Sequence, residues 1–328
     1  MNSKTISILR ALILYILLAF LLWWSLRAVP IIDIWLTLKL LHFWQIAILL
    51  FLNGIVILAM SARWWVILRA DIPGIPFWKL VRYRLAVFGL SYFTPGPQVG
   101  GEPLQVVYMQ RWHGVTFARA TAAVINDKLL EILANFILLG VGLTAAIRVG
   151  LVPLSSTQAF GTLVPLVLIL LLPLVHLVML YQGKYPVSTV LRAVLSRFER
   201  QKWMRIAIVS ERMAASFTYR HPRSLMAAFG FSLLSWAGMA AEYFLMADFL
   251  HVRLSAGQTL AALSTALFAF LMPLPGGLGA LEASQVFVLT TFGYPAAIGI
   301  GISLLMRARD ILNGALGLLL TGRDYRVK

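Results

Sequence analysis

Residues 160–181 read FGTLVPLVLILLLPLVHLVMLY, and His176 is the only side chain in this run that titrates near neutral pH. About 20 helical residues cross the roughly 30 Å hydrocarbon core of a bilayer. Equally uncharged runs extend from Arg253 to Glu282 and from there to Met306. These stretches predict helices that span a membrane.

The overall composition agrees with this prediction. Of the 328 residues, 60% are hydrophobic and 12% are charged, which is too few charges for a water-soluble surface. The formal net charge of +16 would suggest nucleic acid in a soluble protein. Here the basic residues lie at segment ends, where the positive-inside rule places them, so no nucleic-acid partner is expected. The absence of Cys and the scattered positions of the five His predict no metal site and no cofactor.

The charge pattern also predicts the topology. Basic residues cluster between Arg63 and Arg84, in the segment 182–223 and at the end of the chain, which favours cytoplasmic N- and C-termini. The segment 182–223 is interpreted as a cytoplasmic loop with two amphipathic basic helices at the membrane surface, and a solvated hairpin is the alternative. Six full spans are predicted, at residues 6–26, 43–62, 118–147, 160–181, 224–249 and 295–320.

Two further apolar regions, 85–112 and 257–292, are interrupted by Pro and Gly. The interruptions read TPGPQVGGE at 94–102 and PLPGGLGALE at 273–282. Irregular backbone at membrane depth is tolerated only where protein buries it or where it lines a cavity. Each region is therefore interpreted as a re-entrant helical hairpin, and two ordinary spans joined by a surface turn remain the alternative.

The same order of residues occurs twice in the chain. A Gly-Gly pair precedes a Glu, a Gly follows after 12 or 11 residues, a cation after 14 more, and an acid three residues later. We interpret the regions 72–147 and 254–320 as repeat-like halves of a single membrane domain, 1–328. With six spans the halves have opposite orientations, as in transporters with inverted repeats. The residues are Glu102, Gly114, Lys128 and Glu131 in the first half and Glu282, Gly293, Arg307 and Asp310 in the second.

The pairs Lys128/Glu131 and Arg307/Asp310 are the first candidates for a functional site. Both lie well inside predicted spans, where an unpaired charge costs at least about 2.5–3.5 kcal/mol. A spacing of three residues places each cation and acid on one helix face. Each pair is either a salt bridge that fixes helix packing or a cation presented to a phosphate and positioned by the acid.

Glu102 and Glu282 begin the returning half of each hairpin. Either the helix dipole favours a carboxylate there, or these residues respond to protons or cations and couple transport to an ion gradient. Glycines beside them would let an anionic head group approach the amide groups of the helix N-terminus. The glycines concerned are Gly100, Gly101, Gly276, Gly277 and Gly279.

These motifs resemble the flippase-like transmembrane family, which is the membrane region of lysylphosphatidylglycerol synthases. The resemblance covers nearly the whole chain and implies a multi-pass bacterial or archaeal membrane protein. In the bifunctional synthases, this region is similar to a lipid flippase that precedes a cytosolic aminoacyl-transfer domain. The sequence ends at Lys328 soon after the last predicted span, so that transfer domain is not expected here. The matching residues are Gly100-Gly101-Glu102, Lys128 with Glu131, the run from Pro275 to Glu282, and Arg307 with Asp310.

Two positions depart from the family pattern. Gln105 stands where the family often has Arg, and Lys128 stands where Arg is common. These differences leave the identity of the lipid open. The variant Gly-Glu-Pro-Leu-Gln at 101–105 resembles members that are associated with hopanoid biosynthesis.

The sequence therefore predicts a flippase-like transporter in a bacterial cytoplasmic membrane. It would translocate an amphiphilic, anionic-headed lipid or lipid-linked compound between leaflets and would not be an enzyme. Membrane lipids, and further lipid-biosynthetic enzymes, are the expected partners, and no oligomeric state is predicted. The alternatives are an intramembrane enzyme with a Glu as general base, a non-transporting scaffold for lipid-biosynthetic enzymes, and a small-solute transporter.

Overall fold

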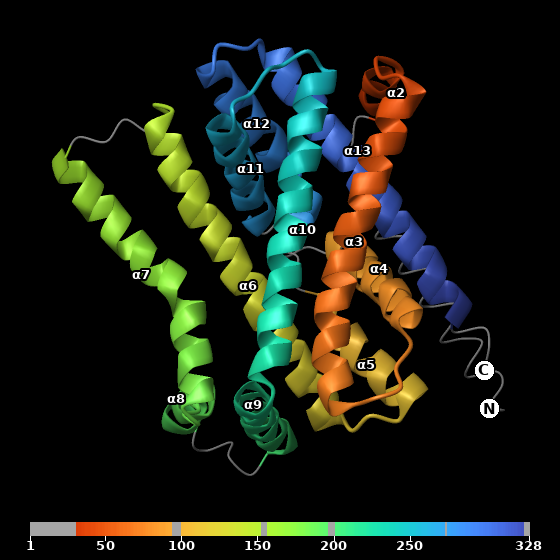
Figure 1. The fold of residues 1–328 in the computed structure, drawn as a ribbon, viewed down its shortest axis with the longest axis vertical. Helices are drawn as coiled ribbons and strands as arrows, with labels where there is room; N and C mark the ends of the chain where they lie inside the picture. Colours follow the sequence, from red (N-terminus) through yellow and green to blue (C-terminus); the bar gives the residue numbers. More distant parts are fainter. Residues whose placement is uncertain (1–30, 94–99, 152–155, 196–200, 273, 325–328) are drawn as a thin grey trace. The chain divides into compact units, whose positions relative to one another are not determined.

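The computed structural model describes residues 31–93, 100–151, 156–195, 201–272 and 274–324, and all regular structure in these ranges is helical (Figure 1). The predicted all-α class is therefore confirmed. The helices are α2 (Ile31–Lys39), α3 (Phe43–Asp71), α4 (Phe77–Phe93), α5 (Glu102–His113), α6 (Phe117–Arg148), α7 (Ser156–Tyr181), α8 (Pro186–Val194), α9 (Lys202–Arg220), α10 (Pro222–Phe249), α11 (Ala256–Leu271), the 3-10 turn η2 (Pro275–Gly277), α12 (Ala280–Thr291) and α13 (Ala296–Asp324).

Five of the predicted spans coincide with described helices, namely α3, α6, α7, α10 and α13. The predicted span 6–26 lies outside the described residues. Within the described ranges, α3, α6 and α10 are long and apolar enough to cross a membrane, judged by length and composition. The chain is thus a multi-pass helical membrane protein, and the number of six full crossings stays a prediction.

The end of the second span was predicted wrongly. It was placed at residue 62 with Arg63 and Arg69 beyond it, but α3 continues to Asp71. The apolar residues between the two arginines extend the helix, and Arg63 is buried with 1% of its surface exposed. Arg63 is therefore part of the helix interior and not of a cytoplasmic loop.

The interrupted regions form pairs of short helices. In the second region, α11 and α12 are joined through η2, where Gly276, Gly277 and Gly279 have φ of 53°, 63° and 78°. A side chain strains this left-handed backbone, so these positions suit glycine. In the first region, α4 and α5 lie on either side of residues 94–99, which are outside the described residues.

The chain forms two compact units. Unit 1 comprises Met1–Asn53, Arg82–Gly101 and Ala241–Lys328, and unit 2 comprises Gly54–Val81 and Glu102–Ala240. In unit 1, α12 packs against both α11 and α13 (Figure 1). In unit 2, α9 packs against α6, α7 and α8.

Glycines bring α4 and α13 together in unit 1. A Cβ atom on Gly317 would lie 1.9 Å from the carbonyl oxygen of Leu85, and one on Gly89 would lie 2.5 Å from that of Gly314. Neither position has room for a side chain unless the backbones separate. Small residues at helix interfaces allow this kind of close packing in membrane proteins.

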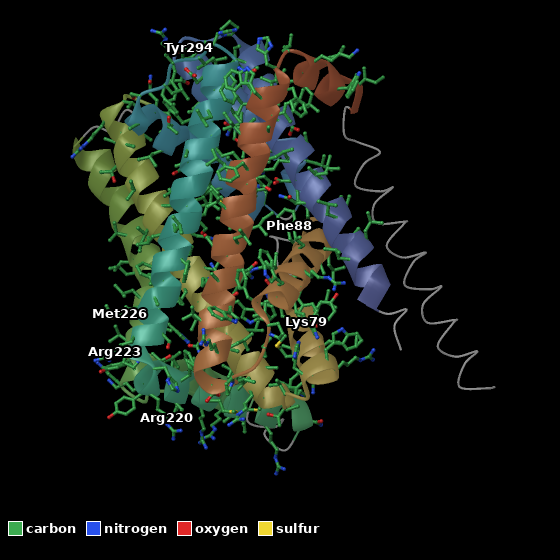
Figure 2. The ribbon with its side chains drawn as sticks, turned by 45° about the vertical axis from the view of Figure 1, so that its right-hand side comes forward. Lys79, Phe88, Arg220, Arg223, Met226 and Tyr294 are labelled. Carbon is green, nitrogen blue, oxygen red and sulfur yellow. The ribbon has the colours of Figure 1, made fainter. Side chains whose placement is uncertain are left out.

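The segment 182–223 contains the predicted pair of helices, α8 and α9. The carboxylate of Glu211 in α9 accepts hydrogen bonds from the backbone N–H groups of Val187 (2.8 Å) and Ser188 (2.6 Å), so α9 caps the start of α8. Arg220 and Arg223 lie at the α9–α10 junction, at one end of unit 2 (Figure 2). The cytoplasmic location of this segment stays a prediction.

The order and lengths of four helices recur along the chain. Helices α3 to α6 have 29, 17, 12 and 32 residues, and α10 to α13 have 28, 16, 12 and 29. A shift of 178 or 179 residues carries the first residue of each helix onto that of its counterpart. The recurrence therefore includes α3 and α10, which precede the predicted halves 72–147 and 254–320.

Helices α3 and α10 run in opposite directions where they meet. In unit 2, Arg63 donates a hydrogen bond to Ser232 (3.5 Å), and a Cβ atom on Gly238 would lie 2.7 Å from Val56. Gly238, which follows Ser232 in α10, thus faces Val56, which precedes Arg63 in α3. In unit 1, the rings of Trp44 and Phe249 meet edge to face with centroids 5.4 Å apart, in the same antiparallel register.

Candidate functional site

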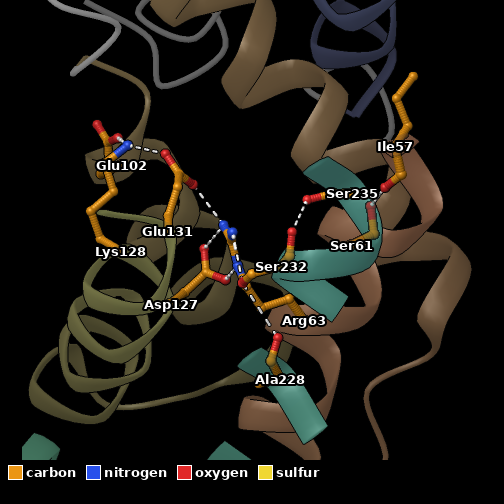
Figure 3. A network of polar contacts seen from close by, with 10 residues as sticks. All are labelled: Ile57, Ser61, Arg63, Glu102, Asp127, Lys128, Glu131, Ala228, Ser232 and Ser235. Carbon is orange, nitrogen blue, oxygen red and sulfur yellow. Dashed lines mark hydrogen bonds and ion pairs between the residues drawn. The ribbon is translucent and has the colours of Figure 1, made fainter. Parts of the chain in front are cut away.

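The first polar cluster lies in unit 2 and is built around Lys128 of α6 (Figure 3). Its ammonium group lies 2.9 Å from Oε1 of Glu102 at the start of α5 and 2.7 Å from Oε1 of Glu131. The predicted contact between Lys128 and Glu131 is therefore present, and Glu102 joins it. The side chain of Lys128 is 26% exposed, so it is partly accessible from outside.

Arg63 extends this cluster to α3 (Figure 3). Its guanidinium donates to both oxygens of Asp127 (2.7 and 3.3 Å) and to Oε2 of Glu131 (2.6 Å). The sequence analysis missed this residue because it counted Arg63 among the basic residues that follow the second predicted span. The apolar run that continues after Arg63 was the signal, since a cation inside a span needs a partner.

We call Arg63, Glu102, Asp127, Lys128 and Glu131 the Lys128 cluster. It contains three carboxylates and two cations, and a chain of hydrogen bonds and ion pairs joins them (Figure 3). Both cations are thus in contact with carboxylates of the protein. An anionic group that binds Lys128 would share its ammonium with Glu102 and Glu131 or replace one of them.

The second cluster lies in unit 1 around Arg307 of α13. Nε of Arg307 donates to Oε1 of Glu282, and Nη2 donates to Oε2 of Glu282 at 2.7 Å. Nη1 donates to the carbonyl oxygen of Gly276 (3.2 Å), and Nη2 also donates to that of Gly277 (3.3 Å). Arg307 is 1% exposed, so its planar fork fastens the turn η2 to α13.

The predicted pairing of Arg307 with Asp310 is wrong. Asp310 accepts from Arg309 at 2.8 Å, while Arg307 is taken by Glu282. Arg309 also donates to Glu242 of α10 at 2.9 Å, and Glu242 is buried. The spacing of three residues suggested a pair, but the fork of Arg307 is directed to the turn. The sequence analysis named neither Arg309 nor Glu242 as a candidate.

The candidate glycines serve the protein's own contacts. Gly101 donates its N–H to Ser91 (2.9 Å), and a Cβ atom there would lie 2.4 Å from the carbonyl oxygen of Val87. The N–H of Gly279 donates to Oε2 of Glu282 (3.0 Å), so this carboxylate caps the start of α12. Gly100 is half-buried beside the undescribed residues 94–99. The prediction that these amides receive a head group stays untested.

A family model for the lysylphosphatidylglycerol synthase TM region matches residues 7–317. The chain belongs to this family. It is also similar to the UPF0104 membrane protein PH1989 of Pyrococcus horikoshii, with 23% identity over 311 residues and 89% of each chain covered. No solved structure matches the chain.

In this family member the two clusters have equivalent places in the recurring helices. A shift of 179 residues carries Lys128 onto Arg307, and a shift of 180 carries Glu102 onto Glu282. Each of these glutamates forms an ion pair with the cation of the following long helix. The ion pairs between α5 and α6 and between α12 and α13 thus reproduce one arrangement in two units.

Asparagines connect neighbouring helices in unit 2. The side chain of Asn126 donates to the carbonyl oxygen of Ala214 (3.4 Å) and accepts from Thr218 (3.1 Å), both in α9. Asn135 accepts from Trp236 of α10 at 3.1 Å. Both asparagines therefore bridge neighbouring helices, as polar side chains in membrane proteins often do.

Proposed function

We propose that this chain translocates an amphiphilic lipid or lipid-linked compound, with an anionic head group, between the leaflets of a bacterial cytoplasmic membrane. The observation that carries the proposal is the recurrence of one ion pair, Glu102 with Lys128 and Glu282 with Arg307. Two equivalent polar sites in one membrane chain suit a substrate that is received from one leaflet and delivered to the other.

The lengths of the interrupted helices support re-entrant hairpins. At 1.5 Å per residue, the 16 residues of α11 and the 12 of α12 extend about 24 and 18 Å, less than the roughly 30 Å of hydrocarbon. Glu282 and the carbonyl groups of η2 would then lie at membrane depth. Polar backbone is tolerated there when the protein satisfies it, as Arg307 does here.

The antiparallel contacts of α3 and α10 support an inverted repeat. These are the first helices of the two recurring sets, and they run in opposite directions where Arg63 meets Ser232 and where Trp44 meets Phe249. Inverted repeats allow a transporter to exchange the conformations of its two halves and so to open to either side.

The head group would move by exchange of ion-pair partners. A phosphate oxygen would replace Glu102 at Lys128, which is the more exposed of the two cations. Charge-assisted bonds of this kind are strong, so the exchange conserves most of the interaction energy. Glu102, once released, is the group that would couple transport to an ion gradient. Acyl chains would remain in the bilayer.

The topology and the absence of catalysis are also proposals. The many basic residues of the α8–α9 segment support a cytoplasmic position for it and for both termini. Glu102 and Glu282 recur symmetrically, each paired with a cation, and this arrangement suits access from two sides better than intramembrane catalysis. Lipid-biosynthetic enzymes would supply the substrate.

Reconstitution tests this proposal directly. Purified protein is inserted in liposomes with a fluorescent phospholipid in both leaflets, and dithionite quenches the label that reaches the outside. We expect faster loss of the protected signal with wild type and with Lys184→Ala, whose side chain is exposed. We expect the loss to slow to the protein-free rate with Lys128→Ala and Arg307→Ala. Equal rates for all four proteins would remove these cations from transport.

A further inference from the structure

Gln285 of α12 has a full set of hydrogen bonds in unit 1. Its Oε1 accepts from the hydroxyl of Tyr243 at 2.5 Å. Its Nε2 donates to the carbonyl oxygen of Ala262 (3.4 Å), to Thr265 (3.4 Å) and to Ser284 (3.2 Å). The residue is completely buried, so these bonds replace those that water would make.

Gln105 of α5 is the counterpart of Gln285, but its carbonyl oxygen has no bond. Gln105 follows Glu102 by three residues, as Gln285 follows Glu282. It is 1% exposed, and its Oε1 has no hydrogen-bond partner in the described part of the chain. The shift of 179 residues carries Trp64 onto Tyr243, and Nε1 of Trp64 is likewise buried without a partner among the described residues.

Among the described residues, Glu102 also makes fewer hydrogen bonds than its counterpart, Glu282. Both oxygens of Glu282 are bonded, to Arg307 and to the N–H of Gly279. Oε1 of Glu102 meets Lys128, whereas Oε2 is buried and has no partner within the described ranges. We call Glu102 and Gln105 the acceptor pair, because both carry an unused acceptor and lie one turn apart on one face of α5.

The acceptor pair lies beside the Lys128 cluster, through the contact of Glu102 with Lys128. The cluster has three carboxylates and two cations, so it disfavours a group that brings only negative oxygens. A group that donates hydrogen bonds fits both unused atoms. Each such bond changes a binding constant by roughly tenfold.

We propose that the acceptor pair binds the hydrogen-bond donors of a lipid head group, hydroxyl or primary ammonium, while the adjoining phosphate reaches Lys128. Gln105 then determines specificity, because it distinguishes head groups with donors from head groups without them. This inference rests on the proposed lipid translocation. In unit 1 the corresponding acceptors are taken by Tyr243 and Gly279, so the selective site belongs to unit 2.

The test compares phospholipids that share the phosphate and the acyl chains. Phosphatidylethanolamine offers ammonium donors, phosphatidylglycerol offers hydroxyl donors, and phosphatidylcholine offers neither. The midpoint of thermal unfolding of the full chain in detergent is measured as each lipid is added. We expect a donor-bearing lipid to raise the unfolding midpoint at a roughly tenfold lower concentration than phosphatidylcholine does. If phosphatidylethanolamine is more effective than phosphatidylglycerol, the preferred donor is an ammonium group; the reverse order identifies a hydroxyl group.

Variants of Gln105 assign the effect to this residue. Gln105→Met removes one of the two acceptors at similar volume and should reduce the advantage of the donor-bearing lipids over phosphatidylcholine. Gln105→Glu keeps acceptor oxygens and should retain the preference. Tyr243→Phe, which removes a donor in unit 1, should lower the midpoint without lipid and leave the preference unchanged.

Four outcomes bear on the inference. Equal action of the three lipids on wild type would overturn it, as expected if water alone fills these positions. A preference of undiminished size in Gln105→Met would overturn it as well. Lipid translocation is measured on the same preparations: translocation without selectivity would refute the acceptor pair alone, and selectivity without translocation would refute the proposed transport alone.

Discussion

Arg63 and Glu242 occupy equivalent positions, 179 residues apart, and carry opposite charges. Arg63 in α3 is buried and bonds to Asp127 and Glu131 of α6. Glu242 in α10 is buried and bonds to Arg309 of α13. In each recurring set the first and fourth helices are therefore joined by a buried ion pair, with the polarity reversed.

Removal of Arg63 should destabilise unit 2. In Arg63→Met, the carboxylates of Asp127 and Glu131 lose their ion pairs with Arg63, and breaking a buried ion pair costs about 3–5 kcal/mol. Thermal unfolding in detergent should show a clearly lower midpoint. Arg69→Met removes an exposed cation from the same helix and should change stability by less than about 1 kcal/mol.

A second substitution tests whether loss of charge compensation causes this destabilisation. Asp127→Asn, added to Arg63→Met, removes a buried charge that Arg63 had neutralised and should recover part of the lost midpoint. If the double variant unfolds at the midpoint of the single variant or below it, charge compensation does not explain the role of Arg63.

Replacement of Gly276 should loosen the α11–α12 hairpin. Gly276 has φ of 53°, and a Cβ atom there would lie 2.9 Å from Cζ of the Tyr92 ring. Left-handed backbone alone costs a residue with a side chain about 1–2 kcal/mol. Gly276→Ala should therefore lower the unfolding midpoint, whereas Gly230→Ala in α10, with nothing within 4 Å, should leave it equal or higher. Similar midpoints for the two variants would contradict the tight turn.

Much of the fold followed from the sequence because membrane helices have a strong signal. Long uncharged runs predicted five of the described helices, and Pro and Gly marked both interruptions. Boundaries were harder to predict, since Arg63 was taken as the end of a span although the apolar pattern continues beyond it. A charge within an apolar run ends a helix or is paired inside it, and only the partner on another helix decides which.

The site was predicted only in part, because sequence spacing finds contacts within one helix but not contacts between helices. The spacing of three residues found the contact of Lys128 with Glu131, which is local to α6. The same spacing failed for Arg307 and Asp310, because Arg307 bonds to residues 25 to 31 positions away in the chain. The repeat pointed to Glu102 and Glu282, but it was not extended upstream to α3 and α10. Extending the repeat to these two helices places Arg63 opposite Glu242, and it would have marked both charged residues as candidates for buried ion pairs.

The fork of Arg307 leads to the last prediction. One guanidinium bonds to Glu282 and to the carbonyl oxygens of Gly276 and Gly277, which an ammonium group with a single charged atom cannot do in the same geometry. Arg307→Lys should therefore keep the charge but release the turn η2, with a lower unfolding midpoint and translocation in liposomes slowed by about tenfold or more. Arg253→Lys, at an exposed position, should match wild type in both measurements. Wild-type translocation by Arg307→Lys would mean that charge alone suffices at this position. The proposed role of the turn would then have to be given up, whereas the role of the cation would stand.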